Sequence, residues 1–418
     1  MDNNLKNLLS KLYNNDLDEQ VPRYSGLIKE FVEKFGREDY QLFSSPGRTE
    51  IGGNHTDHNH GKVIAASINL DSIAVASPRK KNEVILYSEG YKDAFVVNLD
   101  TSGPVKEEKL TTSALIRGVA AGFKKYGYKT GGFEACITSN VLVGSGLSSS
   151  ASIEVLIGTI FNFFYNEGKV PADQIAIIGQ YSENNYFGKP CGLMDQVACA
   201  TGGIITIDFY DPQNPVIKKI NFDFLETRYR LIVVNTEGNH ADLTEDYAAI
   251  PNEMKKVAEF FGKKYCADVS EGELLSNIKE LRKRTGDRAI LRAIHFIEEN
   301  KRVIKQVEYL NKNLFNKFIS LVNESGNSSY KYLQNIFSPN SYSEQGVSLG
   351  LVLSDIFIKR KGRGACRVHG GGFAGTIQLF LPEELIAEYT DFIADLFNRN
   401  SVKVLLIRDQ GAVCLNNL

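Results

Sequence analysis

Apolar residues recur at two different spacings along this chain, and the change of spacing predicts where helices and strands lie. Residues 4–14 and 24–36 carry apolar side chains three or four positions apart, which is typical of amphipathic helices. From residue 62 to about residue 99 the spacing drops to two, in short runs separated by turn residues. This alternation predicts strands of an antiparallel or mixed sheet, with the two helices packed across it.

The rest of the chain mixes helical and strand patterns without regular alternation. Helices are predicted over 113–126, 149–165, 172–186, 243–262, 288–311, 314–324, 345–358 and 382–398. Strands are predicted over 132–138, 203–208, 229–235, 373–381 and 402–408. The turn-rich stretch 210–215 favours a domain boundary. The pattern predicts an α+β protein with two domains, 1–215 and 216–418.

Composition narrows the classes of function. The chain has 418 residues, of which 43% are hydrophobic and 23% charged, as in a folded globular protein. Its formal net charge of −2 gives no reason to expect nucleic acid or an anionic membrane as a partner. We expect neither a signal peptide nor a membrane span. The six cysteines form no C-x-x-C pair and predict reduced thiols, so we expect a cytoplasmic protein.

Residues 141–155 are the stretch best suited to chemistry. Two glycines and a run of serines directly precede an apolar helical pattern, so backbone N–H groups can point out of a helix N-terminus. Such a terminus binds phosphate, and serine hydroxyls can bind phosphate or magnesium. The loop lacks the lysine of the common phosphate-binding loop. A serine-rich helix cap would explain the same residues, so the stretch alone leaves both interpretations open.

A second polar stretch, 45–61, is predicted to be a glycine-bearing loop. Its His-x-Asp-His-x-His core contains residue types that bind metal ions. Ligands so close together on one flexible loop rarely face one ion, and we therefore disfavour a dedicated transition-metal site. Arg48, His55 and Asp57 are better suited to hydrogen bonding with the hydroxyl groups of a small polar ligand.

Two further segments carry candidate groups. A predicted helix that bears Glu183 is broken at Gly188, and the turn that follows delivers Asp195. Asp195 can accept a proton there, or it can cap a helix. Residues 364–376 contain three successive glycines, which are costly in chain entropy and indicate a close approach of the backbone to another group.

Together these segments resemble the three sequence motifs of the GHMP small-molecule kinases, most closely those of the galactokinases. The first family motif runs Gly-Arg-Val-Asn-Leu-Ile-Gly-Glu-His-Thr-Asp-Tyr, and it is matched at Gly47, Arg48, Gly53, His55, Thr56 and Asp57. The family's phosphate loop, Gly-Leu-Ser-Ser-Ser-Ala-Ser, is unchanged at 146–152. The third motif, Arg-Met-Thr-Gly-Gly-Gly-Phe-Gly-Gly, is matched at Arg367, Gly370, Gly371, Gly372, Phe373 and Gly375. Residues 190–196 look like the galactokinase segment that carries a catalytic aspartate.

The resemblance implies a two-domain GHMP kinase fold, with an N-terminal domain like domain 2 of ribosomal protein S5 and a ferredoxin-like C-terminal domain. It implies that ATP lies along Gly144, Ser145, Gly146, Leu147, Ser148, Ser149, Ser150 and Ala151. Mg²⁺ is expected at Glu183 and at Ser149 or Ser150. Asp195 is expected to be the base, with Arg48 beside it. The expected sugar-binding residues are Asn54, His55, Asp57, Gly192 and Tyr247.

The expected reaction is ATP-dependent phosphorylation of a monosaccharide, first of all D-galactose to galactose 1-phosphate, by direct in-line transfer. Two departures from the family motif bear on the sugar, because Asn54 stands at a glutamate position and His58 at a tyrosine position. An amide in place of a carboxylate can change which sugar fits, so a pentose, an amino sugar or a uronic acid stays open.

Other functions remain as alternatives. A non-catalytic sensor that binds sugar and ATP is the alternative outside the enzyme class. A mevalonate or homoserine kinase is disfavoured by the sequence context of Asp195, which lies between methionine and glutamine. The sequence leaves the oligomeric state open, with a monomer as the expectation, and small molecules are the expected partners.

Overall fold

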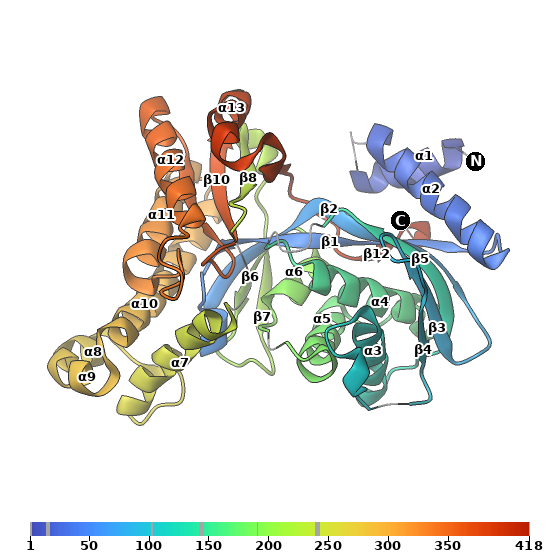
Figure 1. The fold of residues 1–418 in the computed structure, drawn as a ribbon, viewed down its shortest axis with the longest axis horizontal. Coiled ribbons are helices and arrows are strands. Elements are labelled where there is room, and N and C mark those ends of the chain that lie inside the picture. Colours follow the sequence, from blue (N-terminus) through green and yellow to red (C-terminus); the bar gives the residue numbers. More distant parts are fainter. Residues whose placement is uncertain are drawn as a thin grey trace.

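The chain folds around two β-sheets, a larger one of eight strands and a smaller one of four (Figure 1). The computed structural model describes residues 2–13, 17–101, 103–141, 146–189, 191–238 and 243–417. The larger sheet comprises β1 (Gln41–Gly52), β2 (Lys62–Pro78), β3 (Glu83–Ser88), β4 (Phe95–Asn98), β5 (Phe133–Ser139), β6 (Ile204–Asp208), β7 (Val216–Ile220) and β12 (Val413–Cys414). The smaller sheet comprises β8 (Tyr229–Asn235), β9 (Ala365–His369), β10 (Thr376–Pro382) and β11 (Val402–Leu405).

Helices cover both sheets. They are α1 (Asp2–Tyr13), α2 (Leu17–Phe35), α3 (Thr112–Lys125), α4 (Ser149–Asn166), α5 (Ala172–Ser182), α6 (Met194–Thr201), α7 (Thr244–Phe260), α8 (Glu271–Ser276), α9 (Ile278–Thr285), α10 (Asp287–Asn311), α11 (Phe315–Ser328), α12 (Gly346–Lys361) and α13 (Ile386–Phe397). A π-helical turn continues α5 at Glu183–Phe187, and another continues α11 at Ser329–Leu333. None of the helices in the described residues is long and apolar enough to cross a membrane.

The larger sheet is mixed, which is one of the two arrangements that the alternating pattern predicted. Its centre is β2, which is long enough to pair antiparallel with β1, β5 and β6, whereas β3 and β5 run parallel. Helices α3 to α6 lie on one face and α1 with α2 on the other (Figure 1). The core under α3 to α6 is built from apolar residues of the sheet and these helices, among them Phe43, Ala74, Phe123, Phe161 and Val197. The site residues on β1 therefore stand on a rigid, buried scaffold.

Residues 45–52, predicted to be part of a loop, are instead the second half of strand β1. Every residue of β1 after Gln41 is buried, because the strand pairs with β2 and β12 and both of its faces are covered. Its polar side chains are buried as well, and most of them have hydrogen-bond partners there; Glu50, for example, accepts from Asn54 and Arg367. A strand with two buried faces shows no alternation of polar and apolar residues, so the sequence pattern missed it.

The two halves of the molecule share one apolar cluster. The smaller sheet has the order β11-β8-β10-β9, with all pairs antiparallel. Phe318 on α11 and Phe380 on β10 pack in the same cluster as Ile51 and Ile64 of the larger sheet. The strands β7 and β12 extend the larger sheet from beyond residue 215. A domain boundary at residue 215 stays a proposal. If the boundary lies there, β7 and β12 come from the second domain and extend the sheet of the first.

Candidate active site

Arg48 and Asp195 form an ion pair between the larger sheet and the start of a helix. Arg48 lies on β1 and Asp195 in the first turn of α6. Arg48 Nε donates to Asp195 Oδ1 at 2.7 Å, and Arg48 Nη2 donates to Asp195 Oδ2 at 2.6 Å. A pair with two parallel hydrogen bonds fixes the distance and the plane of the carboxylate. The fold thus brings together the two groups assigned to catalysis from the sequence.

The serine loop, residues 146–152, contacts this pair directly. Ser148, the residue before α4, has a φ of 60°, a left-handed conformation that is unfavourable for a residue with a side chain. Its hydroxyl donates to Asp195 Oδ2 rather than capping the helix. Arg48 Nη1 donates to the carbonyl of Gly146. Arginine, aspartate and serine loop therefore form one hydrogen-bonded unit.

Helix α4 presents its N-terminus at the same point. The first N–H groups of the helix, from Ser149 to Ala151, have no carbonyl within the helix to bind. Leu147 anchors the loop, because its side chain is fully buried and its carbonyl accepts from the backbone N–H of Arg48 at 3.1 Å. Gly144 and Ser145 of the predicted ATP site lie outside the described residues. The free N–H groups and the positive end of the helix dipole are suited to bind an anion next to Asp195.

Asp195 is held as a carboxylate. Burial favours its neutral form, but the charge of Arg48 and hydrogen bonds from Arg48 and Ser148 outweigh burial and lower the pKa of Asp195 below its usual value. The side chain is 26% exposed, so it can be approached from outside. An ionised carboxylate accepts hydrogen bonds and donates none, and it can therefore orient a hydroxyl group that approaches it.

Ser150 and Glu183 form the pair expected to hold Mg²⁺. Glu183 opens the π-helical turn after α5, a rare geometry that is frequent at functional sites. Ser150 Oγ donates to Glu183 Oε1 at 3.0 Å. Mg²⁺ takes oxygen ligands, commonly one or two from the protein beside phosphates and water, so this donor set fits the ion. Within the described ranges no group of three or more His, Cys, Asp or Glu side chains could hold a metal ion by itself.

Sequence reasoning missed Gln196, which supports Glu183, and Glu154, which binds the same amide group. Gln196 Nε2 donates to Glu183 Oε2 and to Glu154 Oε2, in both cases at 3.0 Å. Glu154 is fully buried, and burial together with the charge of Glu183 raises the pKa of Glu154 well above its usual value. The one signal in the sequence was that Gln196 directly follows Asp195.

The segments that carry Asp57 and Gly192 touch each other. A Cβ atom on Gly192 would lie 2.0 Å from Asp57 Oδ2, so only glycine permits this approach. Tyr247 on α7 reaches the glycine loop, residues 370–372, where its hydroxyl donates to the carbonyl of Gly372 at 3.3 Å. These predicted sugar-binding residues thus come from three separate parts of the chain and gather around the third motif and the segment before Asp195.

The histidines of the first motif have different partners. His55 Nε2 donates to the carbonyl of Gly371 at 3.0 Å. Burial and the nearby ring of His58 lower the pKa of His55 to about 3, so the imidazole is neutral. His60 instead stacks on Tyr265, with ring centroids 3.5 Å apart. His55 is therefore the histidine that faces the glycine loop.

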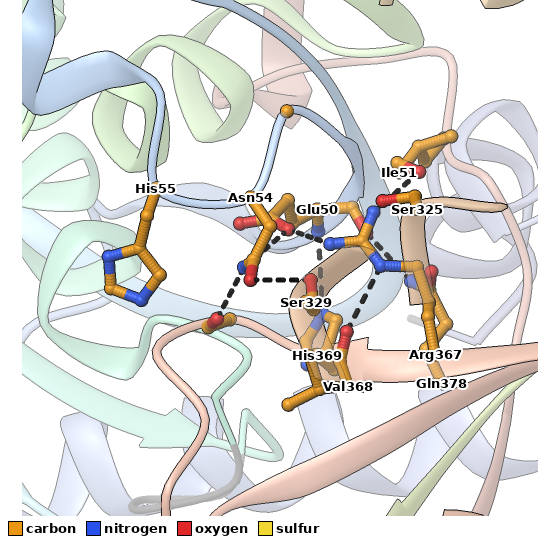
Figure 2. A network of polar contacts seen from close by, with 12 residues as sticks. Glu50, Ile51, Asn54, His55, Ser325, Ser329, Arg367, Val368, His369 and Gln378 are labelled. Atoms are coloured by element: carbon orange, nitrogen blue, oxygen red, sulfur yellow. Dashed lines mark hydrogen bonds and ion pairs between the residues drawn. The ribbon is translucent and has the colours of Figure 1, made fainter. Parts of the chain in front are cut away.

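Asn54 is fully buried, and protein groups occupy its amide completely. Figure 2 shows its contacts with Glu50 and Ser329. Its Nδ2 donates to Glu50 Oε1 at 3.1 Å and to the carbonyl of Gly370 at 2.7 Å. Its Oδ1 accepts from Ser329 Oγ at 3.2 Å and from Asn335 Nδ2 at 2.9 Å. An amide has two donor hydrogens and two acceptor positions, so none is left for a sugar. The direct sugar contact predicted for Asn54 is not supported by this geometry.

Two family models match the chain. "Galactokinase galactose-binding signature" matches residues 29–78, which include the first motif. "GHMP kinases N terminal domain" matches residues 114–203, which include the serine loop and Asp195. The two models thus cover the segments that meet at the ion pair.

Relatives resemble the chain over most of its length. The galactokinase of Mannheimia succiniciproducens is 30% identical over 386 residues, which cover 89% of this chain and 93% of the relative. The galactokinase of Clostridium acetobutylicum is 29% identical over 382 residues, covering 88% and 92%. The crystal structure of Lactococcus lactis galactokinase complexed with galactose matches with a TM-score of 0.80 and 25% identity, covering 94% and 99%. The Methanococcus jannaschii mevalonate kinase, at a TM-score of 0.61 and 18% identity over 89% and 99%, shows the shared fold alone.

The fold, the serine loop and the ion pair define a GHMP-type small-molecule kinase with an α+β, two-domain architecture, as the motifs predicted. ATP is the phosphoryl donor that this class of enzyme uses. The chain belongs to the galactokinase family and is a galactokinase-type sugar kinase.

Proposed function

We propose that this protein transfers the γ-phosphoryl group of ATP to the anomeric hydroxyl of D-galactose and forms galactose 1-phosphate and ADP. The observation that carries the proposal is the contact of Asp195 with both Arg48 and Ser148 at the N-terminus of α4. A carboxylate for the hydroxyl, a guanidinium for the transferring group and a helix terminus for phosphates lie in one cluster. The galactokinase relatives, and the relative solved with galactose, support galactose as the sugar.

In the proposed reaction the anomeric oxygen attacks the γ-phosphorus, while the bond between this phosphorus and the β–γ bridging oxygen breaks and ADP leaves. The hydroxyl proton passes to Asp195 and then to water. Because the pKa of Asp195 lies below its usual value, Asp195 is a weak base and takes the proton late, as the new P–O bond forms. Its larger contribution is to orient the hydroxyl for in-line attack, while Arg48 offsets the charge of the phosphoryl group.

We propose that Glu183 and Ser150 hold Mg²⁺, with Ser149 next to them at the start of α4. When bound, Mg²⁺ would neutralise charge on the phosphate oxygens of ATP. Ser150 and Gln196 each donate to a different oxygen of Glu183, so this carboxylate is held in a fixed orientation. Support from a neighbouring side chain of this kind commonly tunes the affinity of a metal site.

The test is ADP release with Mg-ATP and a panel of sugars: galactose, glucose, a pentose, an amino sugar and a uronic acid. We expect the highest kcat/KM with galactose. A higher kcat/KM with another sugar would mean that this sugar is the substrate instead of galactose, while the proposed kinase activity would stand. Calorimetric binding of sugar and ATP without ADP release from any sugar would refute the kinase and favour the sensor.

The remaining expectations from the sequence are also proposals. We keep a monomer, a cytoplasmic location, the absence of nucleic-acid and membrane partners, and a division of the chain into 1–215 and 216–418. Sedimentation of the purified protein with and without ATP would test the monomer.

A further inference from the structure

The glycine loop 370–372 is bound by three residues that the sequence assigned to the sugar. Its successive carbonyls accept hydrogen bonds from Asn54 Nδ2 at 2.7 Å, His55 Nε2 at 3.0 Å and the hydroxyl of Tyr247 at 3.3 Å. Asn54 and His55 are neighbours in the first motif, and Tyr247 lies on α7. The loop is therefore fixed in place by the residues around the proposed sugar site.

The same loop lies next to the serine loop. A Cβ atom on Gly146 would lie 3.2 Å from His369 Nδ1 and 3.1 Å from Thr376 Oγ1, and these two residues flank the glycine loop. The glycine loop thus contacts sugar-site residues on one side, and the residues that flank it contact the phosphate site on the other. A residue that positions the glycine loop can influence both sites without touching either substrate.

Glu50 and Asn54 are chemically complementary (Figure 2). Arg367, which is fully buried, donates to Glu50 Oε1 and, at 3.0 Å, to the carbonyl of Ile51. Asn54 Nδ2 donates to the same oxygen of Glu50 at 3.1 Å. Glu50 and Arg367 balance each other in charge. A second carboxylate at position 54 would add an unpaired buried charge, and it would face Glu50 with an oxygen instead of a donor.

Compared with the family motif, this chain has the carboxylate and the amide exchanged between positions 50 and 54. The motif Gly-Arg-Val-Asn-Leu-Ile-Gly-Glu has the amide at the position of residue 50 and the carboxylate at that of residue 54, and this chain has the reverse. In the fold the two side chains are hydrogen-bonded to each other. The residues at positions 50 and 54 therefore fit each other in this chain, because the amide at 54 donates to the carboxylate at 50.

We propose that Glu50 and Asn54 form a positioning pair, in which Asn54 holds the glycine loop and does not recognise the sugar. Sugar selectivity in this chain then rests on other residues of the site, and the pair sets how well the glycine loop is placed. The inference deepens the proposed function and relies on it for the kinetic test alone.

Isosteric substitutions test the pair. Asn54→Asp adds a buried charge, Glu50→Gln leaves Arg367 without its counter-charge, and the double variant restores one carboxylate and one amide. We expect each single variant to lower the melting temperature. The decrease in the double variant should be clearly smaller than the sum of the decreases in the two single variants. Additive losses, or a wild-type melting temperature in Asn54→Asp, would overturn the pair. This thermal cycle decides the inference even if wild-type protein phosphorylates no sugar, a result that refutes the proposed function only.

Kinetics separate positioning from sugar recognition. We expect Asn54→Asp to lower kcat/KM by about tenfold, as for one lost hydrogen bond, for galactose and equally for its derivative without the C6 hydroxyl. The double variant should recover part of that loss. A change in the ratio of the kcat/KM values for the two sugars would show that Asn54 recognises the sugar and would overturn the inference. The matched control is Asn162→Asp, a buried amide that binds Val170 N at 2.9 Å, which should lower the melting temperature and leave kcat/KM unchanged.

Discussion

Replacing Asp195 by asparagine removes one charge from the centre of the site with almost no change of shape. Asp195 accepts two hydrogen bonds from Arg48 and one from Ser148. An amide has a single oxygen, which we expect to stay with Arg48 Nη2 and Ser148, because that position accepts two of the three bonds. The NH₂ group must then face Arg48 Nε, so that two donors meet. Arg48, whose side chain is 8% exposed, is left without its counter-charge.

The expected loss of turnover is large. A positioned acid–base group contributes about 10²- to 10⁴-fold, which is about 3 to 5 kcal/mol of transition-state stabilisation. Loss of one hydrogen bond to a charged group accounts for about 1.5 to 3 kcal/mol of that amount. The rest reflects the lost capacity to take the proton. Breaking a buried ion pair destabilises a fold by about 3 to 5 kcal/mol, and we expect the lower end because Asp195 is 26% exposed.

The assay measures ADP release under saturating Mg-ATP, together with galactose binding by calorimetry. We expect Asp195→Asn to bind galactose and to release ADP far more slowly than the wild type. The control is Asp208→Asn, which breaks the half-exposed pair of Asp208 with Lys62, a kind of pair worth about 0 to 1 kcal/mol. If Asp195→Asn binds galactose and keeps turnover within about tenfold of the wild type, the assigned role is wrong.

Three further changes test other parts of the site. Gly192→Ala places a Cβ atom 2.0 Å from Asp57 Oδ2, so we expect a loss of turnover in a variant whose circular dichroism remains that of a folded protein; normal kinetics would contradict the contact. Ser150→Ala removes the hydroxyl bound to Glu183, and the Mg²⁺ concentration for half-maximal activity should rise by about tenfold; an unchanged Mg²⁺ dependence would exclude this serine as a ligand. Burial and nearby arginine charges lower the pKa of His369 well below its usual value, so below about pH 6.5 the unfolded chain takes up a proton that the folded chain does not, and stability falls as the pH falls. Urea unfolding measures how far the free energy of unfolding falls between about pH 7 and pH 5.5. For His369→Gln this fall should be smaller than for the wild type by about 1 kcal/mol. An equal fall in both proteins would mean that His369 is charged in the fold.

Much of the fold could be predicted from periodicity, because long amphipathic helices repeat their pattern over several turns. α10, predicted over 288–311, spans Asp287–Asn311, and β8, predicted over 229–235, spans Tyr229–Asn235. Short or fully buried elements were missed. α8 and α9 are short and rich in charged residues, and β1 has two buried faces, so none of them shows the spacing that a longer or half-exposed element would show.

The candidate site could be predicted only as far as its motifs are local. The serine loop and the residues around Asp195 are short stretches whose composition indicates their chemistry. The supporting groups are distant from them in sequence: Gln196 Nε2 meets a carboxylate 42 positions away, and Glu50 meets an arginine 317 positions away. No local pattern identifies such partners, because each depends on how the sheets and helices pack. For the same reason the burial of Asn54 was not foreseen.

The backbone conformation of Ser148 links the serine loop to Asp195. A left-handed conformation is unfavourable by roughly 1 to 2 kcal/mol for a residue with a side chain, and Ser148 adopts it at a φ of 60°. A charge-assisted hydrogen bond to Asp195 stabilises by about 1.5 to 3 kcal/mol, enough to offset this strain. The hydroxyl of Ser148 donates to Asp195 and makes no capping bond to the helix. The N–H groups at the start of α4 then remain available for phosphate, while the same hydroxyl helps to keep Asp195 ionised. In the proposed reaction, the anion site that the loop could form by itself serves phosphoryl transfer because Asp195, 47 positions later, is held beside it by Arg48.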